Sequence, residues 1–177
     1  SDLAVDWYSD QMLGNFFMLT CPYLYDVEAL AYFALLRNYH SFHATGPIGD
    51  TTQVLLDVAR AAGVKPILGM EAYVAGPKGR ADRSERVSRH LILLAKNAEG
   101  WANLRYLSSM AYTEGFYYDP RIDKGLLRDH AKGLVGLTAC LGGEVPRLAH
   151  KGDMDGARAA AREYRDIFEP GSFFLEV

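Results

Sequence analysis

The segment from Arg89 to Lys124 most constrains what this chain can fold into, because it joins three kinds of element. It begins with an apolar run, Leu91–Ala95, whose length and lack of polar alternation are typical of a strand covered on both faces, as in a parallel sheet. Asn97 can then cap a helix with apolar side chains at three- and four-residue spacing, which Gly115 is predicted to end. An aromatic loop follows, Phe116–Arg121, and we predict that it is ordered and that its rings pack against neighbouring elements.

Predicted helices and strands alternate from residue 51 onward, which is typical of a parallel sheet or a β/α barrel. The predicted strands lie near residues 66–74, 90–95, 133–139 and 173–177. Nearer the amino terminus we predict a strand at Phe16–Cys21, helices that begin after Asp26 and Thr52, and a loop at His40–His43. In folds of this kind, the carboxyl ends of the strands and the loops that follow them build the functional site.

Composition limits the domain organisation and the compartment. A chain of 177 residues with 49% hydrophobic content can bury one substantial core, so we expect a leader at residues 1–15 and a single domain over 16–177. The net charge of -3 argues against a free-standing nucleic-acid binder. Two cysteines, Cys21 and Cys140, make no disulfide framework, and no apolar run approaches the roughly 20 residues of a membrane span. We therefore predict a cytoplasmic protein without membrane contact.

Three side chains of metal-binding type lie on or beside three separate predicted strands: Glu71, His90 and Cys140. Carboxylate, imidazole and thiolate groups all bind transition metals, so these side chains are candidates for one shared centre. Each also has a structural explanation. Glu71 fits a solvent-facing strand acid, His90 a core histidine and Cys140 a buried small thiol. Both interpretations remain open at this level.

The loop at residues 76–88 is rich in glycine and charge, with several arginines and one lysine on its positive side. A solvated surface loop is one interpretation, and contact with phosphate groups is the other.

Four blocks of sequence together resemble a known family: GVKPILGMEAYVA, the block from His90 to Lys124, GLVGLTACLGGEVPRL and FFLEV. They occur in the order, and with closely similar spacing, found in the PHP (polymerase and histidinol phosphatase) domain of bacterial replicative DNA polymerase III alpha subunits. The resemblance covers residues 61–177 most clearly. It implies an α/β fold, a distorted β/α barrel whose strand ends hold a metal cluster. It also places Glu71, His90 and Cys140 at positions of metal ligands.

The amino-terminal part departs from the family pattern. The family begins with a strand of the type F-x-H-L-H-x-H, whereas Met18, Thr20 and Pro22 occupy the histidine positions here. The family's later T-D-H-G segment is replaced by Ala44–Pro47. A late Asp-x-His pair and the polymerase palm come after FFLEV in the family, so we expect an incomplete PHP-like barrel and a degenerate metal site.

The resemblance implies a region of a DNA-directed DNA polymerase that acts mainly as a structural and interaction module in DNA replication. This chain alone is then expected to be inactive, with no catalytic residues and no required cofactor, although a residual site would suit zinc or manganese. The expected partners are the remainder of the polymerase and other replisome proteins, such as a proofreading exonuclease, and DNA is contacted only through the parent polymerase. The alternative is a metal-dependent phosphoesterase of the PHP type, a 3′-5′ exonuclease or pyrophosphatase.

Overall fold

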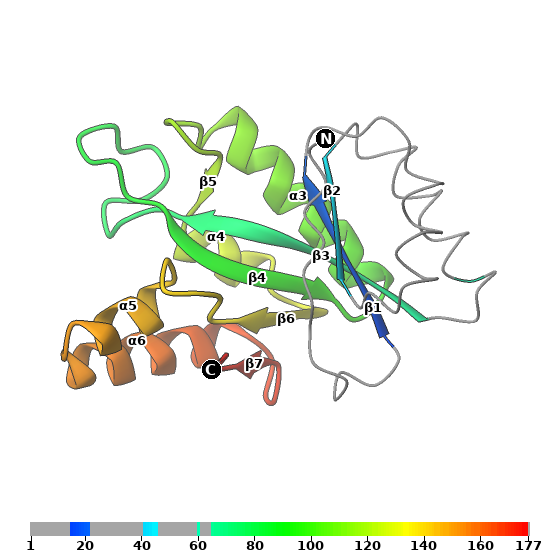
Figure 1. Cartoon of the computed structure of the whole chain (residues 1–177). Helices are drawn as coiled ribbons and strands as arrows, with labels where there is room; N and C mark the ends of the chain where they lie inside the picture. The colour runs from blue at the N-terminus through cyan, green and yellow to red at the C-terminus, as the bar shows by residue number, and fades with distance from the viewer. Residues whose placement is uncertain (1–14, 22–40, 46–59, 61–64, 177) are drawn as a thin grey trace. The chain divides into compact units, whose positions relative to one another are not determined.

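The computed structural model describes residues 15–21, 41–45, 60 and 65–176, and the chain divides into two compact units at Met70 and Glu71. In the first unit, strand β1 (Asn15–Cys21) lies between β2 (Ser41–Thr45) and the amino-terminal part of β3 (Lys65–Val74), and both pairings are parallel (Figure 1). The predicted strand at Phe16–Cys21 is therefore confirmed.

The prediction of a loop at His40–His43 is wrong for the residues that the structure describes, because Ser41–Thr45 is a strand. These residues pair along β1, with Phe17 opposite Ser41 and Cys21 opposite Thr45, and this pairing outweighs the nearby turn signals. The helix predicted after Asp26 lies outside the described residues. So do the helix predicted after Thr52, apart from Arg60, which is helical, and the predicted leader, apart from Asn15.

The second unit contains the carboxyl-terminal part of β3, followed across the sheet by β4 (Arg89–Ala95), β6 (Leu134–Leu137) and β7 (Phe173–Phe174). The short strand β5 (Arg121–Ile122) pairs with the end of β3. The helices of this unit are α3 (Ala98–Thr113), α4 (Lys124–Asp129), α5 (Glu144–His150) and α6 (Met154–Ile167). From β4 to α5, strands and helices alternate as predicted, whereas β3 and β4, and likewise α5 and α6, follow each other directly.

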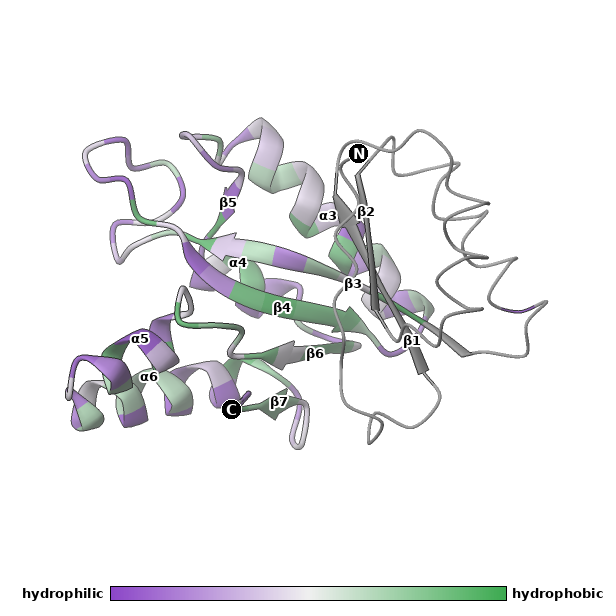
Figure 2. Ribbon diagram, viewed as in Figure 1, coloured by the Kyte–Doolittle hydropathy of each residue, from purple (hydrophilic) through white to green (hydrophobic). Residues whose placement is uncertain are grey.

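The expectation of parallel strands throughout is wrong for β4. Strands β4 and β6 are antiparallel, with Ile92 opposite Leu137 and Ala95 opposite Leu134. In Figure 1 the arrows of β3 and β6 point one way and that of β4 points the other. The apolar run of β4, which is green in Figure 2, does place Leu91 and Leu93 in the core. An apolar run reports burial, however, and the direction of a strand depends on the path by which the chain returns to the sheet.

Helix α3 begins as predicted, because the side chain of Asn97 accepts a hydrogen bond from the N–H of Gly100 at 2.9 Å. Its buried face carries Leu104, Leu107 and Ala111. The helix ends at Thr113 with Glu114 as its C-cap, directly before Gly115, as predicted. Glycine is also needed here because a Cβ would overlap the carbonyl oxygen of Arg121.

The aromatic loop is organised differently from the prediction. Phe116 is 52% exposed and Tyr118 is 63% exposed, so these two rings do not supply the expected buried area. The buried side chain is Arg121, at 1% exposure. Its guanidinium donates hydrogen bonds to the carbonyl oxygens of Asp82 at 2.6 Å and Arg80 at 3.2 Å. The loop is therefore fixed by an arginine that satisfies backbone carbonyls.

Helix α6 packs against α5 and turns Ala157, Ala160, Tyr164 and Ile167 into the core. The Tyr164 hydroxyl donates to Glu144 Oε2 at 3.0 Å, so the one polar atom of this buried ring is satisfied. In the part of the chain that the structure describes, no helix is long and apolar enough to span a bilayer.

Candidate metal centre

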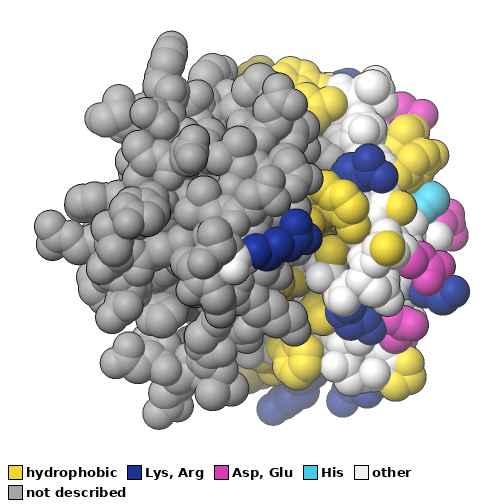
Figure 3. Space-filling model, turned by 90° about the vertical axis from the view of Figure 1, so that its right-hand side faces the viewer, with side chains coloured by type: hydrophobic (Ala, Val, Ile, Leu, Met, Phe, Trp, Pro, Cys, Tyr) yellow, Lys and Arg dark blue, Asp and Glu magenta, His cyan; other side chains and the backbone are white. Residues whose placement is uncertain are grey.

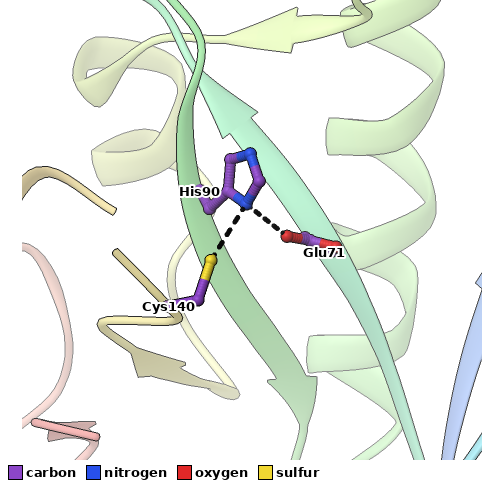
Figure 4. Close-up of side chains that lie close together, drawn as sticks. All are labelled: Glu71, His90 and Cys140. Atoms are coloured by element: carbon purple, nitrogen blue, oxygen red, sulfur yellow. Dashed lines mark hydrogen bonds and ion pairs between the residues drawn. The ribbon is translucent and has the colours of Figure 1, made fainter. Parts of the chain in front are cut away.

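The three candidate ligands come from three neighbouring segments of the second unit (Figure 4). Glu71 lies on β3, His90 near the start of β4, and Cys140 in the loop that follows β6. Because β4 runs opposite to β6, its amino end lies beside the carboxyl end of β6. The loop after β6 then passes His90 and makes a β-bridge between His90 and Gly143. The reversed direction of β4 therefore brings the imidazole beside the loop that follows β6.

His90 is at the centre of the group. Its Nδ1 lies 2.7 Å from Oε1 of Glu71 and 3.5 Å from Sγ of Cys140. One donor atom from each of the three residues lies within 4.8 Å of the other two. A carboxylate can only accept a hydrogen bond, so the short contact with Glu71 places a proton on Nδ1. A metal ion bound between these side chains would take the place of that proton.

The donor set suits a transition-metal ion. One oxygen, one nitrogen and one sulfur are ligands that zinc uses, and tetrahedral zinc holds nitrogen and sulfur ligands about 3.5 Å apart. The Nδ1 to Sγ distance of 3.5 Å matches this value, whereas the Nδ1 to Oε1 distance of 2.7 Å is that of a hydrogen bond and would lengthen on ligation. Among the described residues, no other group of three or more histidine, cysteine and acidic side chains comes together in this way.

Two of the three purely structural explanations fit less well, whereas Glu71 is exposed on β3, as a solvent-facing strand acid would be. Cys140 is exposed, so it is not the buried small thiol that one interpretation required. The side chains of His90 and Glu71 are 31% and 33% exposed, so the imidazole is not a fully buried core histidine. Ions in solvent can therefore reach the group.

The loop after Cys140 holds the imidazole in place. The backbone N–H of His90 donates to the carbonyl oxygen of Gly142 at 3.2 Å, and the N–H of Gly142 points at Sγ of Cys140 at 3.4 Å. A Cβ on Gly142 would lie 2.9 Å from Cγ and Nδ1 of His90. The ring of Tyr73 contacts the imidazole edge to face, with 5.2 Å between the ring centroids. The small residues after Cys140 thus allow the backbone to approach the imidazole closely.

A second acid, Glu176, adjoins this loop and was missed by the sequence analysis. Its backbone N–H donates to Oγ1 of Thr138 at 2.9 Å, and its carboxylate accepts a hydrogen bond from the N–H of Ala139. Its Oε2 is buried and has no hydrogen-bond partner. Burial raises the pKa of Glu176, and the negative charge of Glu71 raises it further. The available signal was an acid directly after the apolar residues of the last predicted strand.

The cations of the loop at residues 76–88 mostly contact the protein itself. Arg80 forms ion pairs with Glu114 at 2.7 Å and Asp123 at 2.9 Å, and Arg83 donates to the carbonyl oxygen of Glu114 at 3.0 Å. The contacts of Arg80 and Arg83 favour the interpretation of a surface loop over that of a phosphate-binding one. Figure 3 shows a different face of the molecule, on which Lys and Arg side chains also lie among Asp and Glu side chains.

The chain belongs to the PHP domain family, whose sequence profile matches residues 38–177. It is also similar to proteins named DNA polymerase III subunit alpha from several bacteria. It is 49% identical over 124 residues to that of Treponema pallidum (strain Nichols), covering 68% of this chain and 10% of the relative. It is 51% identical over 118 residues to that of Chlamydia trachomatis serovar D, covering 64% of this chain and 9% of the relative. The Thermus aquaticus protein is 47% identical over 124 residues, covering 67% of this chain and 10% of the relative. The chain thus spans about a tenth of the length of these relatives.

Proposed function

We propose that this chain is the PHP region of a bacterial replicative DNA polymerase III alpha subunit, and that it serves in the cytoplasm as a structural and interaction module in DNA replication. The family match and the names of the relatives support this assignment. A region that spans about a tenth of those proteins would contribute to the polymerase without carrying its nucleotidyl-transfer chemistry.

The observation that carries the proposal is the small number of candidate ligands that come together among the described residues. Glu71, His90 and Cys140 come within 4.8 Å of one another, and together they offer three protein ligands. Hydrolysis by two metal ions requires ligands for both ions, held about 3.5 to 4 Å apart, to stabilise the attacking and the leaving oxygen. By the resemblance to the family's sequence pattern, Met18, Thr20 and Pro22 stand where the family's first strand would supply histidines. These ligands therefore suit one ion, zinc or manganese.

A single ion at this place would have a structural role. When bound, it would supply positive charge that links β3, the start of β4 and the loop after β6. The chain's own residues would position the ligands, because Gly142 and Tyr73 both contact the imidazole. Glu71 and Cys140 would supply negative charge to the bound ion.

The proposed partners are the remainder of the polymerase and other replisome proteins, such as a proofreading exonuclease, and DNA would be contacted only through the parent polymerase. Exposed aromatic side chains support a protein-binding surface: Tyr112, Phe116 and Tyr118 are each more than half exposed. The buried Arg121 fixes the loop that carries two of them, so these rings are presented on an ordered segment.

The test is a hydrolysis assay on the full 177-residue chain and its His90→Ala variant. The substrates are a generic phosphodiester and 3′-mispaired DNA, each with added zinc, manganese or magnesium. We expect the same background rate from both proteins, because three ligands do not hold a pair of ions. Metal-dependent turnover that His90→Ala abolishes would instead establish the alternative, a phosphoesterase of the PHP type.

A further inference from the structure

We propose that Glu176 is a fourth member of the metal centre and supplies an oxygen to the bound ion, either from its own Oε2 or through one water that Oε2 holds. This inference rests on the proposed function, because it presupposes that Glu71, His90 and Cys140 hold an ion. Glu176 is not one of the three residues whose donor atoms lie within 4.8 Å of one another.

Glu176 is attached to the loop that carries Cys140. Glu176 is bonded to two consecutive residues of that loop: its N–H donates to Oγ1 of Thr138 at 2.9 Å, and its carboxylate accepts from the N–H of Ala139. Cys140 is the next residue. The position of the carboxylate is therefore tied to the backbone that presents the thiol.

Glu176 has a buried carboxylate oxygen without a hydrogen-bond partner. Oε2 of Glu176 is the one buried side-chain nitrogen or oxygen atom, among the described residues, that lacks a hydrogen-bond partner. Removing a carboxylate oxygen from water without a partner is unfavourable by several kcal/mol in general terms. A cation, or a water bound to one, provides the missing interaction.

Negative charge is concentrated around the candidate metal centre. Glu71 and Glu176 are close enough for the charge of one to act on the other, and a metal-bound Cys140 would add a thiolate. Within the described residues, no lysine or arginine forms an ion pair with either acid. A divalent ion would offset this concentration of negative charge, which the imidazole alone offsets only when it is protonated.

The experiment measures zinc affinity by competition with a chromogenic chelator on the full chain, its Glu176→Gln variant and a matched Glu99→Gln control. Glu99 is an exposed acid at the start of α3 that pairs with Lys132. We expect Glu176→Gln to bind zinc 10- to 100-fold more weakly than wild type, as is typical for loss of a partner of the ligand set, and Glu99→Gln to match wild type. Equal affinity of Glu176→Gln and wild type would overturn the inference and leave the three-ligand site standing. Absence of zinc binding by wild type would instead refute the proposed site itself.

Thermal unfolding without metal separates this role from a structural one. Gln keeps the shape of the side chain and an acceptor for the N–H of Ala139 but removes the unpaired charge. We therefore expect metal-free Glu176→Gln to melt at the same temperature as wild type or higher. A lower melting temperature would show that the carboxylate stabilises the chain by itself, and it would overturn the inference.

Discussion

Nδ1 of His90 lies 2.7 Å from Oε1 of Glu71, and this contact joins the start of β4 to the carboxyl-terminal part of β3. It exists because β4 runs in the opposite direction to the strands on either side of it, as Figure 1 shows. The thiol of Cys140 completes the arrangement at 3.5 Å from the same nitrogen.

A first prediction concerns the thiol. Cobalt(II) added to the full chain should give the near-ultraviolet charge-transfer absorption of a thiolate bound to cobalt, because Cys140 lies beside the imidazole nitrogen. Cys140→Ser should lose this absorption. Cys21→Ser is the matched control and should keep it. Retention of the absorption in Cys140→Ser would show that another thiol holds the ion.

The second prediction concerns Arg121, whose buried guanidinium donates to the carbonyl oxygens of Asp82, Arg80 and Gly115. Lysine keeps the charge but cannot donate to several carbonyls in the same fixed geometry. Arg121→Lys should therefore lower the free energy of unfolding by about 2 kcal/mol or more, measured by chemical denaturation. Arg128→Lys on an exposed face of α4 should change it by less than about 0.5 kcal/mol. Similar values for the two variants would contradict the role of Arg121.

The third prediction concerns the exposed ring of Tyr118, which should contribute much less to stability than the buried Arg121. Tyr118 is 63% exposed and has a φ of 63°, a left-handed conformation that glycine adopts without strain. Tyr118→Ala should lower the free energy of unfolding by less than about 1 kcal/mol. Tyr118→Gly should be at least as stable as Tyr118→Ala, because it relieves a backbone strain of about 1 kcal/mol. A large loss of stability in both variants would mean that the ring packs more closely than its exposure indicates.

A fourth prediction concerns acid stability. Burial by itself would raise the pKa of Asp123, but hydrogen bonds from the N–H groups of Leu126 and Arg80, together with the Arg80 guanidinium, lower it. The folded chain therefore binds this proton more weakly than the unfolded chain. The stabilisation is fully present above the unfolded pKa of about 3.9 and is lost as pH falls through the lower, folded value.

Asp123→Asn removes this titrating group and keeps a residue that caps helices. The difference in unfolding free energy between wild type and Asp123→Asn should shrink as pH falls from 5 to 2. Chemical denaturation at several pH values measures it. A difference that stays constant over this range would show that Asp123 does not contribute through its charge.

The sequence predicted the elements of the second unit better than their directions. The cap at Asn97 and the buried residues of α3 follow from local hydrogen bonding and helical spacing, which a sequence displays directly. The antiparallel pairing of Ile92 with Leu137 depends on how the chain returns after α3 and α4, and no local pattern encodes that path. The sequence likewise showed three rings in the aromatic loop but not that Arg121 would occupy the interior, because burial of an arginine depends on distant carbonyl groups.

The candidate site was predictable in its residues and not in its geometry. Glu71, His90 and Cys140 stood out by chemical type and by resemblance to the family, and the structure brings them together. Glu176 did not stand out, because an acid at the end of a strand is ordinarily exposed. Its buried, unpartnered oxygen becomes visible only when the last segment is placed beside Thr138 and Ala139.

The most direct test of the central claim is the number of metal ions bound per chain. The full 177-residue chain is loaded with zinc or manganese, dialysed, and analysed by elemental mass spectrometry beside its His90→Ala variant. A one-ion site built on Glu71, His90 and Cys140 predicts about one ion per wild-type chain and close to none in the variant, since His90 contacts both other ligands. Two or more ions per wild-type chain, removed together by His90→Ala, would contradict the account and indicate a metal cluster of the kind that hydrolyses phosphoesters.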